Sequence, residues 1–293
     1  MKNKASDGTG NIVRGTVIII IAMVIVFGAV FAWMYSMDML FLPSFIEDLI
    51  GNNDEPSWDL GALSALVKNE KSEDGELLTF EVSYESLLSA LLNSERAEGI
   101  YISADIKYYS ASQEITRRVV YYRNGEKFRI ESYAAVPESS TGVGAFEALK
   151  ISDGNQICFL DNLSGEFSTI TYDKKILPEE EAGIPSVDAL LLALSEFPLS
   201  EGSAAEPGAM NVANTSLKLI RTELGNVYYV KFTYGDIGLT EEYYVSLEHR
   251  AVIGMTSTQN GKSVYSYSVN SVSKSTDSYG ADELYDISKA TKQ

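Results

Sequence analysis

The sequence predicts an α+β protein, mainly antiparallel β, in which an N-terminal transmembrane helix precedes a curved, incomplete barrel of about eleven strands with helices on its concave face. Three observations support this fold class. Residues 15–37 contain no charged side chain. From Gly99 onward, apolar residues recur at every second position in many segments, as in strands with one buried face. Short turns join most of these segments, which indicates antiparallel neighbours.

Residues 15–37 are long enough to form a membrane-spanning helix. At about 1.5 Å per residue, a helix of this length reaches roughly 34 Å, which exceeds a hydrocarbon core of about 30 Å. Basic residues precede the segment, and the next basic residue after it is Lys68. The positive-inside rule then leaves residues 1–14 in the cytoplasm. We therefore expect a single-pass protein of the cell membrane with an extracytoplasmic C-terminal domain.

A cleaved signal peptide that ends at Ala32 is the alternative interpretation. Signal peptides usually have an apolar core of about 7–15 residues, which is shorter than this segment, so the length favours an anchor. Beyond the anchor, we expect a juxtamembrane and linker segment at 38–83, with a short possible helix at 59–68. The extracytoplasmic domain proper then covers 84–273. The remaining segment, 274–293, is polar and is predicted to fray.

Two amphipathic helices are predicted in the extracytoplasmic domain. The first covers 84–93 and follows Ser83, a residue type that caps helix N-termini. The second begins after Ser186 and ends before Pro198, because proline cannot continue a helix. The apolar positions of the two helices are Tyr84, Leu87, Leu88, Leu91, Leu92, Val187, Leu190, Leu191 and Leu194.

The strand-like segments form two groups, six before the second helix and five after it, without a crossover helix of the βαβ type. Asn124-Gly125 is expected to form a two-residue hairpin turn with positive φ, and an acidic loop is expected at 177–181. A sheet of this size curls or closes, and the two helices would bury their apolar stripes on its concave face. The predicted strands are 100–109, 114–123, 126–131, 148–152, 156–160, 166–172, 216–223, 227–234, 239–247, 251–258 and 263–273.

The composition excludes several classes of function. Cys158 is the only cysteine and His249 the only histidine, so neither a structural zinc site nor a disulfide framework is available. The net charge of −18 opposes binding to the phosphates of nucleic acids. The sequence contains no nucleophile motif, no glycine-rich phosphate loop and no metal-ligand spacing. We therefore expect no enzyme activity, no cofactor and no metal.

The tyrosines leave two interpretations open. Eight of the 18 tyrosines stand in adjacent pairs within predicted strands, so each pair places one ring on either face of the sheet. They either pack the sheet with their hydroxyls in solvent or line an aromatic groove. Arg117 and Arg118 also lie in a predicted strand, and we interpret them as solvent-facing charges.

Several segments of this domain resemble the LolA-like superfamily, which includes the periplasmic lipoprotein carrier, its outer-membrane acceptor and the N-terminal part of the RseB/MucB regulators. The resemblance implies an incomplete barrel of about eleven strands around an apolar cavity capped by helices. It also implies a binding protein without a covalent mechanism. The segments that carry it are, in order, 84–93, 100–122, 123–131 (RNGEKFRIE), 151–160 (ISDGNQICFL), 244–255 (YVSLEHRAVIGM) and 260–267 (NGKSVYSY).

The leading hypothesis is a membrane-anchored extracytoplasmic protein that holds an apolar ligand, such as a lipid acyl chain or a lipoprotein, in the concave face of its sheet. A tethered domain cannot ferry cargo across a periplasm, so local holding is favoured over shuttling. The alternative is an RseB-like regulatory or sensor module that docks another envelope protein. The expected partners are the membrane, through 15–37, and a lipid, lipoprotein or envelope protein, with no nucleic acid. The predicted apolar lining is Leu87, Leu88, Leu91, Ile102, Ile106, Tyr108, Leu190, Leu191 and Leu194.

Overall fold

The computed structural model describes residues 58–71, 75–110, 113–134, 144–196, 212–274 and 282–290. These residues fall in one compact unit, which begins at Glu55. The predicted cytoplasmic segment and membrane anchor lie outside the described residues. Within the described ranges, no helix combines the length and the apolar character that crossing a membrane requires.

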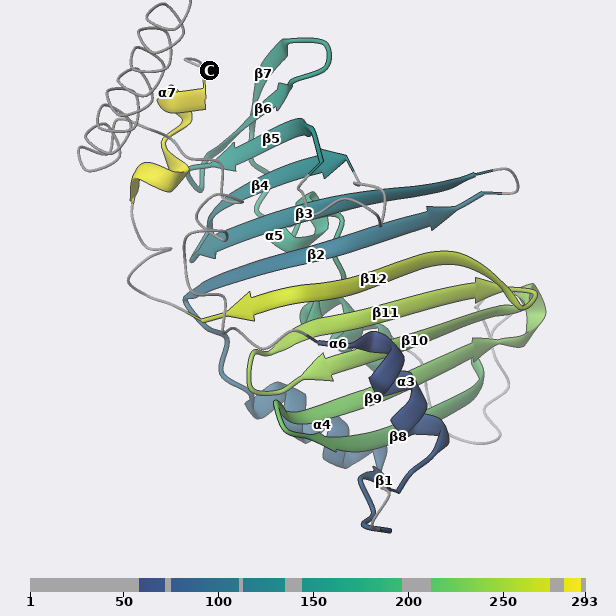
Figure 1. Cartoon of the computed structure of the whole chain (residues 1–293). Coiled ribbons are helices and arrows are strands. Elements are labelled where there is room, and N and C mark those ends of the chain that lie inside the picture. Colours follow the sequence, from purple (N-terminus) through teal and green to yellow (C-terminus); the bar gives the residue numbers. More distant parts are fainter. Residues whose placement is uncertain are drawn as a thin grey trace, which may run out of the picture. The chain divides into compact units, whose positions relative to one another are not determined.

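One antiparallel sheet of twelve strands forms the centre of the fold, in the order β1-β8-β9-β10-β11-β12-β2-β3-β4-β5-β6-β7 (Figure 1). The end strands β1 and β7 each have a single neighbour, so the sheet is open. The predicted mainly antiparallel, unclosed sheet is therefore confirmed. The strands are β1 (Thr79–Glu81), β2 (Gly99–Tyr109), β3 (Glu114–Asn124), β4 (Lys127–Ala134), β5 (Phe146–Ser152), β6 (Gln156–Asp161), β7 (Glu166–Thr171), β8 (Val212–Thr222), β9 (Gly225–Tyr234), β10 (Leu239–Ser246), β11 (Ala251–Gln259) and β12 (Lys262–Ser273).

The sheet consists of two meanders joined at one seam. Strands β2 to β7 form one meander and β8 to β12 form the other, because short turns bring consecutive strands back as antiparallel neighbours. At the seam, β12 pairs with β2, and Tyr267 lies opposite Ile106. Two segments from opposite ends of the domain thus lie side by side.

Two hairpin turns show how local sequence sets the strand pairing. Asn260 and Gly261 both have positive φ, at 51° and 75°, and Gln259 pairs with Lys262 across them. This is the geometry expected of an Asn-Gly hairpin turn. The predicted turn at Asn124-Gly125 is wrong by one residue, because Asn124 pairs with Lys127 and the turn is made by Gly125 and Glu126. Gly125 supplies the positive φ, at 59°.

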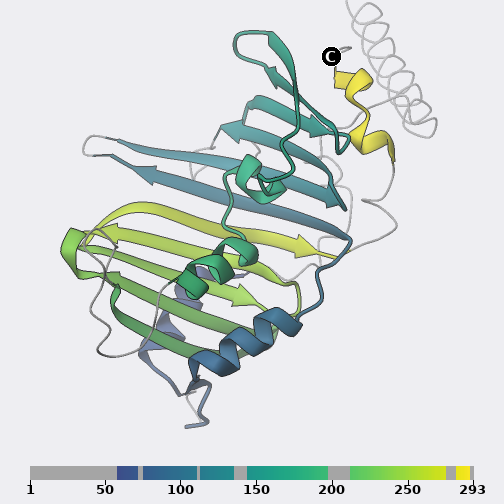
Figure 2. The same ribbon diagram turned by 180° about the vertical axis from the view of Figure 1, so that it is seen from behind.

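Three helices, α4 (Tyr84–Asn93), α5 (Pro178–Ala182) and α6 (Val187–Glu196), lie on one face of the sheet, which we name the α4–α6 face (Figure 2). Helix α3 (Leu60–Lys68) lies on the opposite face, named the α3 face (Figure 1). The two predicted amphipathic helices, α4 and α6, therefore lie on the same face of the sheet, as expected. Strand alternation divides the core accordingly, since Tyr121 joins the larger apolar cluster and its neighbour Tyr122 a smaller cluster on the other face.

The helix starts follow from local capping. The Ser83 side chain accepts a hydrogen bond from the Ser86 amide at 3.2 Å, and Ser186 accepts one from the Ala189 amide at 3.0 Å. Both predicted helices are therefore confirmed at their N-termini. Asp59 caps α3 by accepting from the Gly61 amide at 2.8 Å. The possible helix predicted at 59–68 is thus present.

Several short elements lie where the sequence predicts none. Strand β1 belongs to the segment assigned to the linker, and it pairs with β8. Helix α5 replaces the acidic loop, with Pro178 in its first turn and a left-handed Gly183 at its end. The segment expected to be a frayed tail contains η2 (Asp282–Tyr285) and α7 (Ile287–Ala290). Tyr285 is 2% exposed and packs on the α3 face, so burial of this ring orders the segment. One further short 3-10 helix, η1 (Gly235–Ile237), links β9 to β10.

Candidate functional site

The predicted apolar lining lies on the α4–α6 face, where most of it forms one packed core. Leu191 packs against this core, Leu88 is half-buried, and Tyr108 is 43% exposed. The other six residues are buried within the core: Leu87, Leu91, Ile102, Ile106, Leu190 and Leu194. Leucines of α4 and α6 therefore fill the space above the sheet, and the helices are closed over this face.

A group of polar side chains lies within the same face, where α5 meets the sheet. Glu179 Oε1 lies 3.4 Å from Nε of Arg123 and 3.5 Å from a guanidinium nitrogen of Arg96. Arg123 also donates a hydrogen bond to the carbonyl of Ala97 at 3.0 Å. Together with two tyrosines they form what we name the buried polar cluster, in which Arg96 is the exposed member at the rim: Arg96, Tyr121, Arg123, Glu179 and Tyr267.

Three oxygen atoms of this cluster make no hydrogen bond of good geometry among the described residues, namely Tyr121 Oη, Tyr267 Oη and Glu179 Oε2, although the Tyr121 hydroxyl lies close enough to the Glu179 carboxylate to interact with it. Both tyrosines are 0% exposed. A buried polar atom left unpaired costs about 1–3 kcal/mol, and native proteins pair nearly all such atoms. Arg123 Nε also makes no hydrogen bond within the described residues, so the cluster can still donate three hydrogen bonds and accept at one carboxylate oxygen.

Both tyrosines lie near the same carboxylate. Burial raises the pKa of Tyr121 well above its ordinary value, and the nearby Glu179 carboxylate raises that pKa further. Burial is also the main cause that raises the pKa of Tyr267, with smaller contributions from Tyr265 and Glu179. The two hydroxyls are therefore neutral at physiological pH and act as donors. The chemistry of this cluster suits a neutral hydroxyl or amide group.

Polar contacts hold the two longer helices over the face. Arg250, in the turn after β10, lies 2.8 Å from Asp188 of α6 and 3.1 Å from the hydroxyl of Ser94, which follows α4. The Tyr84 hydroxyl donates to the Leu194 carbonyl at 2.7 Å and so connects α4 to α6. These are few bonds, and several are partly exposed, so they can break without disrupting the sheet.

An aromatic strip continues the α4–α6 face toward the other end of the strands. We define it as Tyr108, Phe232, Tyr234, Tyr243 and Tyr265. The rings of Tyr108 and Tyr265 meet edge-on at 5.5 Å, and those of Phe232 and Tyr243 at 6.0 Å. Tyr234 and Tyr243 both donate hydrogen bonds to Glu241, whose own pKa is raised by burial. Phe232, Tyr234, Tyr243 and Tyr265 pack with the apolar core of this face, so the strip does not decide between the two interpretations of the tyrosines.

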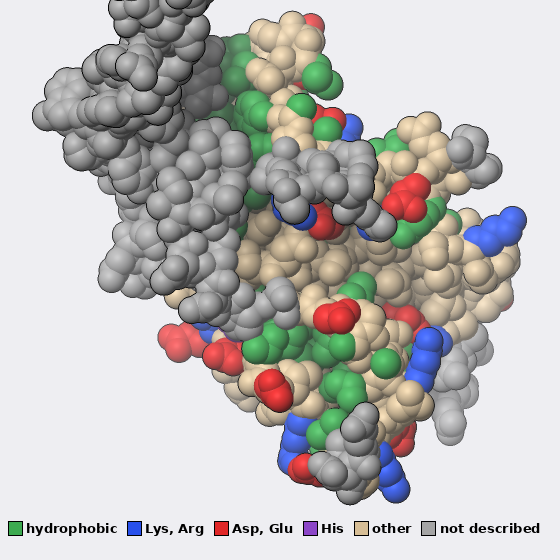
Figure 3. All heavy atoms as spheres, viewed as in Figure 1, with side chains coloured by type: hydrophobic (Ala, Val, Ile, Leu, Met, Phe, Trp, Pro, Cys, Tyr) green, Lys and Arg blue, Asp and Glu red, His purple; other side chains and the backbone are tan. Residues whose placement is uncertain are grey.

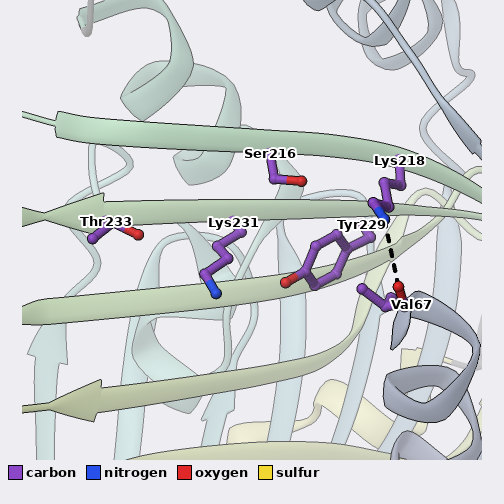
Figure 4. Close-up of a pocket in the computed structure, with 6 residues that line it drawn as sticks. All are labelled: Val67, Ser216, Lys218, Tyr229, Lys231 and Thr233. Carbon is purple, nitrogen blue, oxygen red and sulfur yellow. Dashed lines mark hydrogen bonds between the residues drawn. The ribbon is translucent and has the colours of Figure 1, made fainter. Parts of the chain in front are cut away.

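The α3 face carries a separate, polar groove of about 250 Å³ beside the end of α3 (Figure 4). Lys218 donates to the Val67 carbonyl at 3.4 Å and to Glu70 at 2.6 Å, and the Glu70 hydrogen bond raises the pKa of this lysine. Lys231 pairs with Glu242 at 3.3 Å. Because both lysines already have carboxylate partners, we assign no ligand to this groove. It is lined by Val67, Ser216, Lys218, Tyr229, Lys231 and Thr233.

The single cysteine and histidine occupy unremarkable positions. Cys158 is buried, and burial raises the pKa of its thiol, which opposes a role as nucleophile. His249, in the turn after β10, is half-buried, its Nδ1 lies 3.1 Å from the Ser246 hydroxyl, and burial lowers its pKa. Within the described residues, no group of acidic, His or Cys side chains could hold a metal ion.

The arginines of the buried polar cluster differ from the two that the sequence pointed to. Arg117 and Arg118 face solvent as predicted, with ion pairs to Glu147 and Asp105. Arg123 is not among the predicted site residues, although strand alternation places it on the same face as Tyr121. Glu179 is not among them either, and the sequence carries no local signal for it.

Comparisons with known proteins name no family for this chain. No family model and no curated protein matches its sequence. One similar solved structure is a DUF1329 family protein from Desulfovibrio piger ATCC 29098, with 12% identity, coverage of 69% of this chain and 97% of that chain, and a TM-score of 0.32. Another is the dehydratase domain from the CurK module of curacin polyketide synthase, with 9% identity, coverage of 79% and 93%, and a TM-score of 0.12. Because these TM-scores are low, we base no argument on them, and the resemblance to the LolA-like superfamily remains a prediction from the sequence.

Proposed function

We propose that this protein is a non-catalytic binding module that holds an amphiphilic ligand between its sheet and the helices α4 and α6. The observation that carries the proposal is the set of three unpaired oxygen atoms of Tyr121, Tyr267 and Glu179 inside an otherwise apolar face. Ligand pockets combine an apolar lining with a few convergent polar groups. The buried polar cluster supplies the polar groups, and the helix leucines supply the lining.

The ligand class follows from the chemistry of the cluster. Its arginines already have carboxylate partners in Glu179 and Asp188, so an anionic head group gains little from them. Neutral tyrosine hydroxyls donate, and the free Glu179 oxygen accepts. An acyl chain with a hydroxyl or amide head group matches this pattern, with the chain directed along the aromatic strip.

Binding requires that the helices move, because leucines of α4 and α6 occupy the space above the sheet. In this proposal the contacts of Asp188 with Arg250 and Arg96 hold the closed state, and their loss admits the ligand. Such a module would act locally, anchored to the outer side of the cell membrane through residues 15–37. The protein would carry out no covalent step and need no cofactor.

The test uses the full chain in mild detergent, stripped of bound lipid and titrated with a pyrene-labelled monoacylglycerol. We expect saturable binding that weakens roughly three- to tenfold in Tyr121→Phe and in Tyr267→Phe, since each loses one hydrogen bond worth about 0.5–1.5 kcal/mol. Tyr109→Phe is the matched control, because this half-buried tyrosine also lies on the sheet, at the end of β2, but faces the α3 side. Its affinity should equal that of the wild type.

Two results would contradict the proposal. The first is the absence of saturable uptake together with the absence of co-purifying lipid in native mass spectrometry. The second is equal weakening in all three tyrosine variants. Crosslinking in cells that captures another membrane protein at fixed stoichiometry, without lipid, would instead support the regulatory alternative.

A further inference from the structure

The two edges of the sheet are protected to very different degrees. Strand β1 has only three residues, its Glu81 lies 3.5 Å from Lys218, and Arg221 covers the Phe80 ring at 4.7 Å. Short length and charge are common means by which proteins block an edge strand. Strand β7 has neither protection. All six of its residues are exposed, and its sequence EFSTIT contains one charge and no proline.

Strand β7 also presents apolar side chains to solvent. Phe167 is 43% exposed and Ile170 is 60% exposed. The β6–β7 hairpin stands at the edge of the sheet, and hydrophobic side chains are visible on it (Figures 1 and 3). An exposed, apolar edge strand offers its free backbone groups to another strand.

The register identifies which backbone groups are free. The Tyr172 amide donates to the Asn155 carbonyl at 2.8 Å, which makes these two residues a hydrogen-bonded pair. Hydrogen-bonded pairs alternate along an antiparallel ladder, so Ile170 and Ser168 also bond to β6. The amides and carbonyls of the residues between them therefore point away from the sheet. These residues are Phe167, Thr169 and Thr171.

We propose that β7 pairs antiparallel with β7 of a second copy of this chain, with Thr169 opposite Thr169 on a two-fold axis. In this register Phe167 lies opposite Thr171 of the other copy, so all three outward residues fall in hydrogen-bonded pairs. Each such pair exchanges two bonds, so the junction makes about six. Residues paired across the two copies point to the same face of the sheet. The α4–α6 faces of both copies therefore lie on the same side of one continuous sheet.

The side chains favour a second copy over an unrelated strand. Thr–Thr and aromatic–β-branched pairs are among the favourable cross-strand pairs, and this register creates both on the α3 face. On the other face, Ser168 meets Ile170. Glu166, the one charge of the strand, lies opposite Tyr172 of the other copy, so no like charges meet although the chain carries a net charge of −18. A strand that is complementary to itself suits an isologous dimer.

Cysteine crosslinking tests the register in the full chain. Because Cys158 lies opposite Thr169 in the same copy, the variants are made in a Cys158→Ala background. The two Thr169 Cα atoms would lie about 5.5 Å apart, within disulfide range, whereas the two Ser168 Cα atoms would lie about 7–8 Å apart, beyond it. We expect Thr169→Cys to form at least about tenfold more reducible dimer than the equally exposed Ser168→Cys.

A second variant tests the hydrogen bonds. Thr169→Pro removes an outward amide and leaves the ladder to β6 intact. We expect the wild-type full chain in detergent to sediment as a dimer and Thr169→Pro as a monomer with an unchanged circular dichroism spectrum. Gln259→Lys, an exposed change on β11, should remain dimeric. Equal crosslinking at both positions, a monomeric wild type, or conjugates of Thr169→Cys with other proteins only would each overturn the proposal.

Discussion

Two buried arginine–glutamate clusters lie on opposite faces of this sheet, and they differ in completeness. On the α3 face, Arg129 donates to Glu131 Oε1 at 2.7 Å and the Tyr133 hydroxyl donates to Glu131 Oε2 at 2.6 Å. On the α4–α6 face, Arg123 lies 3.4 Å from Glu179, and the second oxygen of Glu179 has no partner within the described ranges.

The difference follows from the elements that carry the side chains. Arg129, Glu131 and Tyr133 stand at alternate positions of β4, so one strand positions all three. Glu179 belongs to a five-residue helix that meets the sheet from outside. A cluster built on one strand is fully bonded and stabilises the fold. A cluster built across two elements retains free oxygens, which is the property that a binding site needs.

The largest effect is expected when the complete cluster loses its carboxylate. Glu131→Gln removes the carboxylate charge that pairs with the buried Arg129 at 2.7 Å, so the free energy of unfolding should fall by about 3–5 kcal/mol. Urea denaturation of the full chain in detergent measures this loss. Glu114→Gln is the matched control, because Glu114 forms an exposed pair with Lys107 at 3.2 Å and should change stability by less than about 1 kcal/mol. Equal effects of the two changes would show that the buried cluster is not structural.

The second prediction compares the tyrosine of each cluster. Tyr133→Phe removes a hydrogen bond to a buried carboxylate and should cost about 1.5–3 kcal/mol of unfolding free energy. The same denaturation experiment provides the value. A cost below about 0.5 kcal/mol would mean that Glu131 is satisfied without this hydroxyl.

Tyr121→Phe, in contrast to Tyr133→Phe, should not lower the unfolding free energy of the ligand-free protein. The Tyr121 hydroxyl is buried without a hydrogen-bond partner in the described part of the chain, so its removal relieves a desolvation cost. We expect unchanged stability or a gain of about 1 kcal/mol. A loss comparable to that of Tyr133→Phe would show that the hydroxyl is bonded, and the two clusters would then be equivalent.

The smallest effect concerns alkaline pH. The pKa of Tyr121 is raised in the folded state, so its contribution to stability is fully present below the unfolded pKa of about 10 and is lost as the pH rises through the folded pKa. The advantage of Tyr121→Phe over the wild type should therefore widen between pH 9 and pH 11. Thermal unfolding at several pH values measures the difference in Tm. A constant difference would indicate that the Tyr121 pKa is not raised.

Much of the fold follows from local sequence. Ser83 and the helical spacing of the leucines predict α4 with its observed bounds, and alternation predicts the β2 strand to within one residue. The missed elements are those too short to show a period, such as β1 and α5. The meeting of Arg123 and Glu179 depends on how α5 packs on the sheet. No pattern near either residue encodes that contact.

The Arg129–Glu131 cluster also shows where an alternating pattern of apolar and polar residues fails to predict burial. Phe128 and Ile130 alternate with Arg129 and Glu131, which normally indicates one buried and one exposed face. Arg129 and Glu131 are nevertheless buried, at 5% and 3% exposed, among residues packed with Tyr285. The C-terminal segment that packs on this side is polar in sequence, and no periodicity in it predicts the contact.

Because β12 pairs with β2, the sheet can be completed only near the end of synthesis. Strand β2 leaves the ribosome early, whereas β12 is the last strand of the sheet to be made. During that interval the eleven-residue, largely buried β2 lacks one of its two neighbours. An unpaired apolar strand in a nascent chain invites aggregation. A premature stop before β12 would therefore expose two edges at once, those of β11 and β2, and divide one sheet into two.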